Sequence, residues 1–358
     1  MVTRVLIMAG GTGGHIFPAL AVAEQLRAQG AEVLWMGVRG GLETRLVPRA
    51  GFALEAVRIA GLRGKGALGW ILLPARMAVA IAQSLAIIAR FRPAAVLGMG
   101  GFVTGPGGLG AWLMRKPLLV HEQNAVAGLT NRWLAKLASK VMVAFPQALP
   151  RATLTGNPVR AAIAALPLPD ERWLGRSGRL RVLVLGGSQG ARALNEVLPS
   201  VLGAIDAAAR PEVWHQTGKD RDAAVRENYA TQNVQARVEP FIDDMAAAYA
   251  WADVAVCRAG ALTIAELTAA GLGAALVPYP HAVDDHQTRN AEYVVSAGAA
   301  VLLAEGPALR QGLADLFARF CASDGRSRSL AMARAARTLA QPDAAQAVTR
   351  LCMEVAHG

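Results

Sequence analysis

Two glycine-rich turns in this sequence carry residues suited to holding phosphate and moving a proton. The first, Val5–Pro18 (VLIMAGGTGGHIFP), runs from apolar residues through four glycines to His15 and a helical pattern. This order predicts a buried parallel strand, a tight turn and a helix N-terminus. Such a turn presents backbone N–H groups and the positive end of a helix dipole, which together favour phosphate. His15 would lie at its rim, either as a proton-transfer group or as a structural histidine.

The same pattern of strand, glycine turn and helix begins again at residue 181, with RVLVLGGSQGARALNE. The preceding residues, 155–180, contain prolines and glycines that are typical of a linker. We therefore expect an N-terminal domain over residues 1–160 and a C-terminal domain over residues 161–337. The alanine-rich tail, residues 338–358, is predicted to form a helix that returns to the first domain.

Apolar runs followed by helical patterns predict further parallel strands in both domains. In the first domain they are Glu32–Met36, Phe52–Val57, Ala94–Leu97, Leu118–Val120 and Val141–Ala144. In the second domain they are Glu212–His215, Val234–Val238, Val254–Val256 and Ala274–Val277. Strands that alternate with helices predict an α/β fold with a doubly wound parallel sheet in each domain. Such sheets bind ligands at the carboxyl ends of their strands.

Neither glycine turn fits a dinucleotide-binding fingerprint. The GxGxxG pattern would need glycine or alanine at Ile16 in the first turn, and Gly187 is followed two residues later by Gln189 in the second. The acidic residue expected after the second strand is also missing, since Gly37 and Arg39 stand there. No GKS or GKT of a Walker loop is present. What remains is two Rossmann-like domains facing each other across a cleft, the design of GT-B glycosyltransferases.

The composition indicates which classes of molecule this protein is expected to bind. The 358 residues carry a formal charge of +11, which favours phosphorylated molecules or an acidic membrane surface. Aromatic residues are only 5% of the chain and are not interleaved with basic ones, so we expect no nucleic-acid partner. Three scattered cysteines, and a first strand with no leader before it, predict a protein of the cytosol.

Residues 68–90 (LGWILLPARMAVAIAQSLAIIAR) form the stretch that most resembles a membrane segment. A proline and three polar residues interrupt it, so we interpret it as a long helix with one very apolar face. That face either packs on a sheet or enters a bilayer beside neighbouring cations. The residues that would enter the bilayer are Trp70, Ile71, Leu72 and Leu73.

Seven short motifs, in order along nearly the whole chain, resemble those of the MurG family. They are GGTGGH at Gly10–His15, GGFVTGP at Gly100–Pro106, HEQN at His121–Asn124, TGNPVR at Thr155–Arg160, GGSQGA at Gly186–Ala191, RAGALTIAE at Arg258–Glu266 and PHAVDDHQTRNA at Pro280–Ala291. This family transfers N-acetylglucosamine (GlcNAc) from UDP-GlcNAc to undecaprenyl-pyrophosphoryl-MurNAc-pentapeptide (lipid I). The resemblance implies an inverting transfer to the 4-hydroxyl of MurNAc, which makes lipid II for peptidoglycan synthesis, cell shape and cell division.

The resemblance also implies which residues bind UDP-GlcNAc. Glu266 would accept hydrogen bonds from both ribose hydroxyls, although Thr263 and Glu266 also fit a capping box. Amides at the start of the same helix would face the diphosphate, the backbone of Ile242 would meet uracil, and Gln287 would meet the sugar. The full implied set is Thr12, Gly13, Gly14, Asn124, Arg160, Ser188, Ile242, Ala261, Leu262, Thr263, Ile264, Ala265, Glu266 and Gln287.

Two residues compete for the general base that removes the proton of the acceptor hydroxyl. His15 is preferred, because a helix N-terminus disfavours its imidazolium form and keeps it neutral. Glu122 of the HEQN motif is the alternative, with His121 and Asn124 orienting the substrate. The structural interpretation of the same motif is a polar turn after a buried strand.

Two acidic clusters suit a metal site less well than a structural role. Asp220 and Asp222 form a DxD pair before a predicted helix, where they fit a solvated cap. Asp284 and Asp285 precede His286 without a further ligand cluster. Because GT-B transferases generally hold the diphosphate with helix dipoles and cations, we expect no metal and no cofactor bound to this protein.

Two other functions remain open. A UDP-GlcNAc 2-epimerase also uses two facing α/β domains, and it would form UDP-ManNAc from the donor alone. A membrane-associated scaffold would bind the nucleotide sugar without releasing UDP. The leading prediction is a peripheral enzyme at the cytoplasmic face of the cell membrane. Its partners would be UDP-GlcNAc, lipid I, an anionic membrane surface and a cell-wall synthesis complex.

Overall fold

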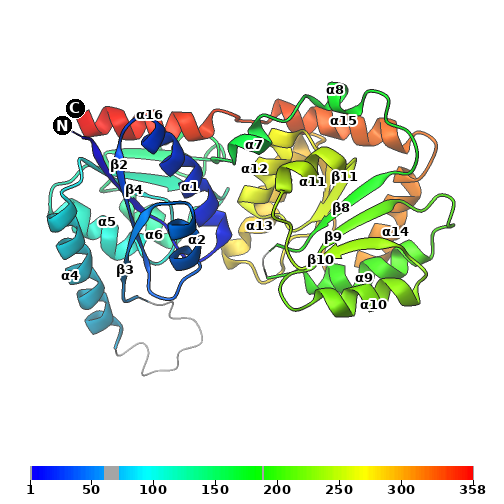
Figure 1. Ribbon diagram of the computed structural model, residues 1–358, viewed down its shortest axis with the longest axis horizontal. Helices are drawn as coiled ribbons and strands as arrows, with labels where there is room; N and C mark the ends of the chain where they lie inside the picture. Colours follow the sequence, from blue (N-terminus) through cyan, green and yellow to red (C-terminus); the bar gives the residue numbers. More distant parts are fainter. Residues whose placement is uncertain (1, 60–71, 188, 358) are drawn as a thin grey trace. The chain divides into compact units, whose positions relative to one another are not determined.

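The computed structural model describes residues 2–59, 72–187 and 189–357, which form two compact units (Figure 1). Unit 1 consists of Met1–Arg160 and Pro342–Gly358, and unit 2 consists of Ala161–Gln341. Three residues singled out in the sequence, Trp70, Ile71 and Ser188, lie outside the described residues.

Unit 1 is built on a seven-stranded parallel sheet with the order β3-β2-β1-β4-β5-β6-β7. Its strands are β1 (Arg4–Met8), β2 (Glu32–Val38), β3 (Ala53–Val57), β4 (Ala95–Gly98), β5 (Leu118–Glu122), β6 (Lys140–Val143) and β7 (Thr153–Leu154). Strand β1 pairs with β2 on one side and with β4 on the other, so the strand order reverses at β1. The carboxyl ends of β1 and β4 therefore form a switch point, where open α/β sheets bind ligands.

Alternate residues of β1 face two helical layers. Val5 and Ile7 share a core with α1 (Gly13–Ala28), α2 (Glu43–Arg49) and α16 (Ala344–His357). Leu6 and Met8 share the opposite core with α4 (Leu73–Phe91), α5 (Thr104–Leu113) and α6 (Leu129–Leu134). Helix α16 comes from the end of the chain and lies against α1 (Figure 1). The first unit is thus completed by residues that follow the second in sequence.

Helix α4 is long and apolar enough, by length and composition, to cross a membrane. Its described residues begin at Leu73, and a proline in the first turn suits a helix start. Ile87 and Ile88 are buried in the unit 1 core, and a Cβ at Gly110 of α5 would lie 3.4 Å from Ile88. Helix α4 therefore packs on unit 1 through one face, while most of its residues, including Val79, are not buried.

Unit 2 repeats this architecture with a six-stranded parallel sheet in the order β10-β9-β8-β11-β12-β13. Its strands are β8 (Arg181–Leu185), β9 (Glu212–Gln216), β10 (Ala236–Glu239), β11 (Val254–Cys257), β12 (Ala274–Leu276) and β13 (Ala300–Leu302). Strand β8 pairs with β9 and β11, so the switch point lies between β8 and β11. The second glycine turn therefore follows the central strand, as the first does in unit 1.

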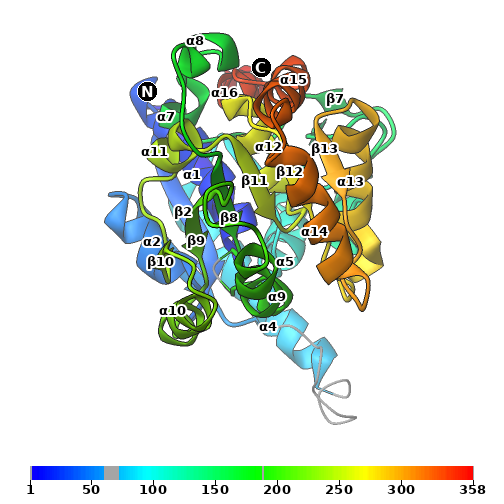
Figure 2. The ribbon, with the colours of Figure 1, turned by 90° about the vertical axis from the view of Figure 1, so that its right-hand side faces the viewer.

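Helices cover both faces of the unit 2 sheet (Figure 2). The helices are α7 (Ala161–Ala164), α8 (Pro169–Trp173), α9 (Arg192–Gly203), α10 (Asp222–Thr231), α11 (Met245–Trp251), α12 (Ala261–Ala270), α13 (His286–Ser296), α14 (Leu309–Phe320) and α15 (Gly325–Thr338), with a short 3₁₀ turn at Val283–Asp285. Helices α9, α10 and α14 bury their apolar faces against Val182 and Val184 of β8. Helices α11, α12 and α15 lie on the other side (Figure 2).

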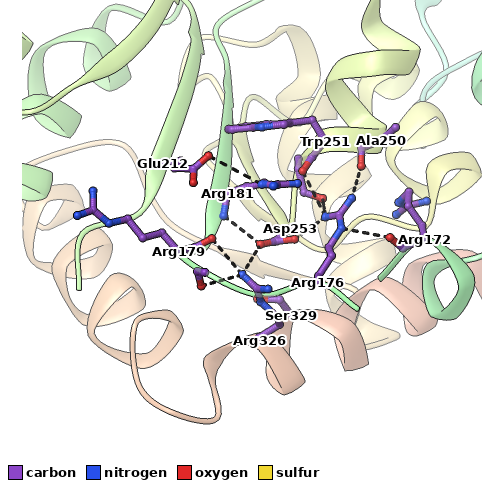
Figure 3. A network of polar contacts seen from close by, with 12 residues as sticks. Arg172, Arg176, Arg179, Arg181, Glu212, Ala250, Trp251, Asp253, Arg326 and Ser329 are labelled. Atoms are coloured by element: carbon purple, nitrogen blue, oxygen red, sulfur yellow. Dashed lines mark hydrogen bonds and ion pairs between the residues drawn. The ribbon is translucent and has the colours of Figure 1, made fainter. Parts of the chain in front are cut away.

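A buried carboxylate fixes the segment that leads into this sheet. Asp253, directly before β11, is fully buried and accepts hydrogen bonds from Arg176, from Arg326 (3.2 Å) and from the backbone N–H of Arg181 (3.0 Å) (Figure 3). Arg176 also donates to the carbonyl oxygen of Trp251 at the end of α11 (3.2 Å). Because the negative charge is paired and hydrogen-bonded, its burial is tolerated. The cluster joins the linker, β11 and α15.

Candidate functional site

The first glycine turn leads from β1 into the open N-terminus of α1. Thr12 is exposed, extended (φ −121°, ψ 160°) and makes no side-chain capping hydrogen bond. The amide of His15 donates to the carbonyl oxygen of Thr12 (3.1 Å). Gly13 and Gly14 lie in the first turn of α1 before His15, so their N–H groups have no acceptor within the helix. This end of α1 favours an anionic group.

A buried carboxylate that the sequence analysis missed supports this turn. Glu43 of α2 accepts hydrogen bonds from the backbone N–H groups of Val38 (2.7 Å) and Gly11 (3.2 Å). A Cβ at Gly10 would lie 2.4 Å from one oxygen of Glu43, and a Cβ at Gly41 would lie 2.4 Å from the other. The glycines at both positions leave room for the close approach of the carboxylate. Glu43 ties the first glycine turn to the end of β2.

His15 is held between two other predicted motifs. Its Nδ1 lies 3.1 Å from Oε1 of Gln123, the residue that follows β5. Gly100 follows β4 with φ +99°, and a Cβ there would lie 2.5 Å from Nδ1 and 2.7 Å from Cε1 of the imidazole. The half-buried ring is thus packed directly on backbone. The structure brings together the GGTGGH, GGFVTGP and HEQN motifs around His15.

Glu122, the alternative base, fixes the loop between β5 and α6 through hydrogen bonds. One carboxylate oxygen accepts hydrogen bonds from the backbone N–H (2.9 Å) and side-chain amide (3.2 Å) of Asn124. The other accepts from the backbone N–H of Gly128 (3.1 Å) and from the amide of Asn131 (2.8 Å). Glu122 is only 2% exposed, and four donors already occupy the lone pairs that a base would use. These contacts favour the structural interpretation of Glu122.

His121 connects β5 with the TGNPVR segment. Its Nε2 donates to the carbonyl oxygen of Gly156 (2.9 Å), and burial lowers the pKa of His121 to about 4, so the ring is neutral near pH 7. The segment ends at Arg160, whose guanidinium carbon lies 5.4 Å from the ring centre of Phe17. Phe17 belongs to α1, two residues beyond His15. Arg160 is therefore brought to the helix that carries the proposed base.

In unit 2, helix α12 is separated from β11 by three residues and carries the residues predicted to bind UDP-GlcNAc. Gly260 is the extended N-cap, and Ile264 donates to its carbonyl oxygen (3.0 Å). The amides of Ala261–Thr263 are therefore at the open end of the helix. No side chain caps this helix, so the capping box expected between Thr263 and Glu266 is wrong. Thr263 lies one turn too far into the helix to act as the N-cap.

Glu266 is almost fully buried and accepts a hydrogen bond from the hydroxyl of Tyr249 (3.0 Å). Tyr249 lies on α11, and the sequence analysis did not single it out. A carboxylate has lone pairs for about four hydrogen bonds, so this contact is compatible with further donors. The tyrosine hydroxyl thus contacts the carboxylate for which the family resemblance implies ribose binding.

A neutral buried network supports the second glycine turn. A Cβ at Gly190 would lie 2.3 Å from the carbonyl oxygen of Thr217, so the turn packs directly on the segment after β9. Asn195 donates to the same oxygen (3.0 Å), and its Oδ1 lies 3.0 Å from Nε2 of His215. Nδ1 of His215 lies 2.9 Å from the hydroxyl of Tyr229. Burial lowers the pKa of His215 to about 3, which keeps this network uncharged.

The other residues of unit 2 that the family resemblance implies for UDP-GlcNAc binding lie on neighbouring segments. Ile242 is buried between β10 and α11. Gln287 of α13 accepts a hydrogen bond from the backbone of Tyr279 (2.9 Å), and Asn290 of the same helix donates to the carbonyl oxygen of Ala259 (3.2 Å). Because Ala259 precedes α12, this contact ties the helix of Gln287 to the start of α12.

The two acidic clusters make local contacts. Asp222 begins α10 and pairs with Arg226 (2.8 Å), while Asp220 lies 3.8 Å from Lys219 on the surface. Asp285 accepts a hydrogen bond from the hydroxyl of Thr288 (2.6 Å). Within the described ranges, no three His, Cys, Asp or Glu side chains are grouped closely enough to hold a metal ion.

Comparison with known proteins identifies relatives over the whole chain. Residues 5–143 match the glycosyltransferase family 28 N-terminal domain, and residues 181–348 match the glycosyltransferase family 28 C-terminal domain. The chain is 56% identical over 361 residues to the UDP-N-acetylglucosamine–N-acetylmuramyl-(pentapeptide) pyrophosphoryl-undecaprenol N-acetylglucosamine transferase of Nitrosococcus oceani, with 100% of both chains covered. It is 52% identical to the protein of the same name from Marinobacter nauticus, covering 99% of this chain and 98% of that one.

Solved structures share the architecture. The crystal structure of Acinetobacter baumannii MurG is 39% identical, has a TM-score of 0.84 and covers 98% of this chain and 99% of its own. The calicheamicin glycosyltransferase CalG4 has a TM-score of 0.67 at 17% identity, covering 99% of this chain and 100% of that chain, and shows the fold alone. The two parallel-sheet units thus have the GT-B fold, as the sequence predicted.

Proposed function

The chain belongs to glycosyltransferase family 28 and is a glycosyltransferase, and we propose that it transfers GlcNAc from UDP-GlcNAc to the 4-hydroxyl of MurNAc in lipid I. The observation that carries this proposal is the 56% identity, over all of both chains, to a relative named for this transfer. The geometry supports it, because each unit offers the open N-terminus of a helix at the carboxyl edge of its sheet.

We assign the donor mainly to unit 2. Glu266, held by Tyr249, would accept hydrogen bonds from the two ribose hydroxyls. The N-terminal amides of α12 would hold the diphosphate, whose negative charge the helix dipole favours. Gln287 would bind the sugar and the backbone of Ile242 would bind uracil. Arg160 and Ser188 would add a cation and a hydroxyl, and Thr12, Gly13, Gly14 and Asn124 would contact the donor from unit 1.

We assign proton transfer to His15 and a structural role to Glu122. The ring of His15 is fixed by Gln123 and Gly100 and lies in the first turn of α1. The helix dipole disfavours its imidazolium form, which suits a group that must be neutral to accept a proton. Glu122 accepts four hydrogen bonds and would have to break some of them to act as a base.

The decisive experiment incubates the full-length protein with UDP-GlcNAc and a soluble lipid I analogue. UDP release together with a disaccharide product would support the proposal. UDP-ManNAc formed from the donor alone would favour an epimerase instead. Saturable binding of UDP-GlcNAc without UDP release would favour a scaffold.

We further propose that unit 1 attaches the enzyme to the cytoplasmic face of the cell membrane, where its lipid substrate and a cell-wall synthesis complex would be. Trp112 on α5 and Trp133 on α6 are exposed, and α5 packs against both α4 and α6. Further exposed apolar residues on or next to these helices are Leu72, Val79, Leu113, Leu129 and Leu137. The amine of Lys136 lies 4.3 Å from the ring centre of Trp133. Exposed aromatic rings beside cations suit an anionic membrane surface.

Vesicle sedimentation tests this surface. Replacing Trp112 and Trp133 with serine should reduce binding to vesicles of anionic lipid, and replacing Trp70 and Leu72 with serine tests the stretch predicted from the sequence. Leu174→Ser is the matched control, because Leu174 is an exposed apolar residue of unit 2 (88%). If both pairs of substitutions leave sedimentation at the level of this control, unit 1 does not supply the membrane contact.

A further inference from the structure

The amide of Gln123 has only one orientation that satisfies its surroundings. Gln123 is buried, and its Nε2 donates to the carbonyl oxygen of Met99 (2.7 Å). A carbonyl oxygen can only accept, so the NH₂ group must face Met99. The opposite orientation would bring two oxygens together. Oε1 of Gln123 is therefore the atom that faces Nδ1 of His15, at 3.1 Å.

This orientation determines where His15 carries its proton. An amide oxygen has no hydrogen to donate, so Nδ1 of His15 must be the donor of this hydrogen bond. In a neutral imidazole, a proton on Nδ1 leaves the lone pair on Nε2. Gly100 packs against the Nδ1 side of the ring. Rotating the ring by half a turn would replace the N–H donor opposite Gln123 with a carbon-bound hydrogen.

We propose that Gln123 is a positioning residue that sets the tautomer of His15 and so presents Nε2 as the proton acceptor. This inference rests on the proposed role of His15 as the base. In the transfer step, Nε2 takes the proton of the acceptor hydroxyl while the hydroxyl oxygen bonds to the anomeric carbon. The bond from that carbon to the diphosphate oxygen breaks, and its electron pair leaves with UDP. Oε1 of Gln123 continues to accept the hydrogen on Nδ1 of the imidazolium.

A neutral partner such as Gln123 also suits a base that must lose its proton again after each transfer. A carboxylate at position 123 would stabilise the imidazolium strongly, because a hydrogen bond between charged groups is about twice as strong as one between neutral groups. The adjacent carboxylate, Glu122, directs its oxygens to Asn124, Gly128 and Asn131. Gln123 thus orients His15 without holding it in the protonated form.

Nitrogen NMR of the full-length protein labelled with ¹⁵N-histidine tests the tautomer directly. The chain has six histidines, and the His15 signals are identified by their loss in His15→Gln. We expect Nδ1 of His15 to be protonated in the wild type, and this preference to be lost in Gln123→Met. Gln29→Met, at the exposed end of α1, is the control and should leave the signals unchanged. An Nε2–H tautomer in the wild type, or an unchanged tautomer in Gln123→Met, would overturn the proposal.

Kinetics provide a second readout that a purely structural role would not move. Gln123→Met should lower kcat about 10- to 100-fold while KM for UDP-GlcNAc stays within about 3-fold, because only proton transfer is affected. Gln123→Glu should move the acidic limb of the kcat–pH profile upward by about one unit, because a carboxylate favours the imidazolium. Wild-type kcat in Gln123→Met, or an unmoved limb in Gln123→Glu, would count against Gln123.

The same variants distinguish a failure of the base assignment to His15 from a failure of the positioning role of Gln123. Near-normal turnover in His15→Gln would remove His15 as the base and leave the tautomer result to decide what Gln123 does. Loss of turnover in His15→Gln combined with an Nε2–H tautomer would overturn the positioning role alone. Thermal melting and UDP binding of each variant show that the fold and the donor site are intact.

Discussion

The two units have the same strand order around their central strands, but they support their glycine turns with different side chains. In unit 1, Glu43 and Glu122 lie at the carboxyl edge and accept hydrogen bonds chiefly from backbone and side-chain amides. In unit 2, the glycine turn rests on the neutral Asn195–His215–Tyr229 network, and Asp253 lies at the opposite edge with two arginines. Buried anions suit the edge where the proposed base, His15, would become an imidazolium. A neutral support suits the edge proposed to hold a diphosphate.

The largest expected effect is the loss of turnover when the proposed base of unit 1 is removed. His15→Ala should lower kcat about 100- to 10,000-fold, because a positioned base contributes a factor of that size. The Kd of UDP should stay within about 3-fold, since the donor is assigned mainly to unit 2. Steady-state UDP release and calorimetric titration measure the two quantities. Near-normal turnover would remove His15 as the base.

The next largest effect is expected when the buried carboxylate of Asp253 in unit 2 is removed. Asp253→Ala should destabilise unit 2 by about 3–5 kcal/mol, because it leaves two arginines without their buried partner. Hydrogen exchange of the β8 and β11 amides measures this locally. Asp170→Ala is the matched control, since Asp170 pairs with Arg334 on the surface and should leave exchange near the wild-type rate. Equal exchange in the two variants would refute the distinction between buried and exposed pairs.

Donor binding should respond to Glu266 and not to the proposed base. Glu266→Gln should raise the Kd of UDP about 10- to 100-fold, because charge-assisted hydrogen bonds to ribose become neutral ones. The control is Glu227→Gln, which changes an exposed carboxylate on α10 of the same unit. Calorimetric titration with UDP provides the comparison. An unchanged Kd would argue against ribose binding by Glu266.

Acid should weaken both units through their buried histidines, by smaller amounts. Burial lowers the pKa of His121 to about 4 and that of His215 to about 3, from 6.5. Each histidine therefore stabilises the fold above pH 6.5, and this contribution is lost as the pH falls from 6.5 towards the folded-state value. The expected loss is about 1.4 kcal/mol per histidine at pH 5.5.

Hydrogen exchange resolved by unit can separate the two histidines. The effect of His121 in unit 1 should level off near pH 4, whereas that of His215 in unit 2 should continue towards pH 3. His215→Gln should flatten the pH dependence of unit 2 only. A wild-type slope in that variant would show that His215 does not govern the acid sensitivity of unit 2.

The sequence predicted those parts of the fold whose signals are local. Strands β1, β5 and β8 are apolar runs bounded by turn residues, and each was placed within a few residues of its observed position. Strand β13 was not predicted, because its three residues lie in an alanine-rich stretch that does not separate strand from helix. The helix Glu43–Arg49 was also not predicted, although its first residue supports the glycine turn.

Residues of the candidate site were likewise predictable only where their signals are local in the sequence. His15 and Glu266 stand inside contiguous motifs, so they could be singled out from the sequence. Their partners could not: Gln123 is 108 residues from His15, and Tyr249 is 17 residues from Glu266. Such contacts exist only once the sheet has brought the strand ends together. The capping box shows the converse, since the local spacing of Thr263 and Glu266 fits a cap that the helix start at Ala261 rules out.

Helix α16 has a consequence for how the molecule is made. Val348, Leu351 and Cys352 belong to the same apolar core as Val5 and Ile7, yet they are synthesised after every residue of unit 2. Although domains generally fold one after another during synthesis, the core of unit 1 cannot close until this helix has left the ribosome. A nascent chain therefore carries an open apolar surface on its first unit throughout translation of the second. Premature termination before α16 would leave that surface permanently open to chaperones and proteases.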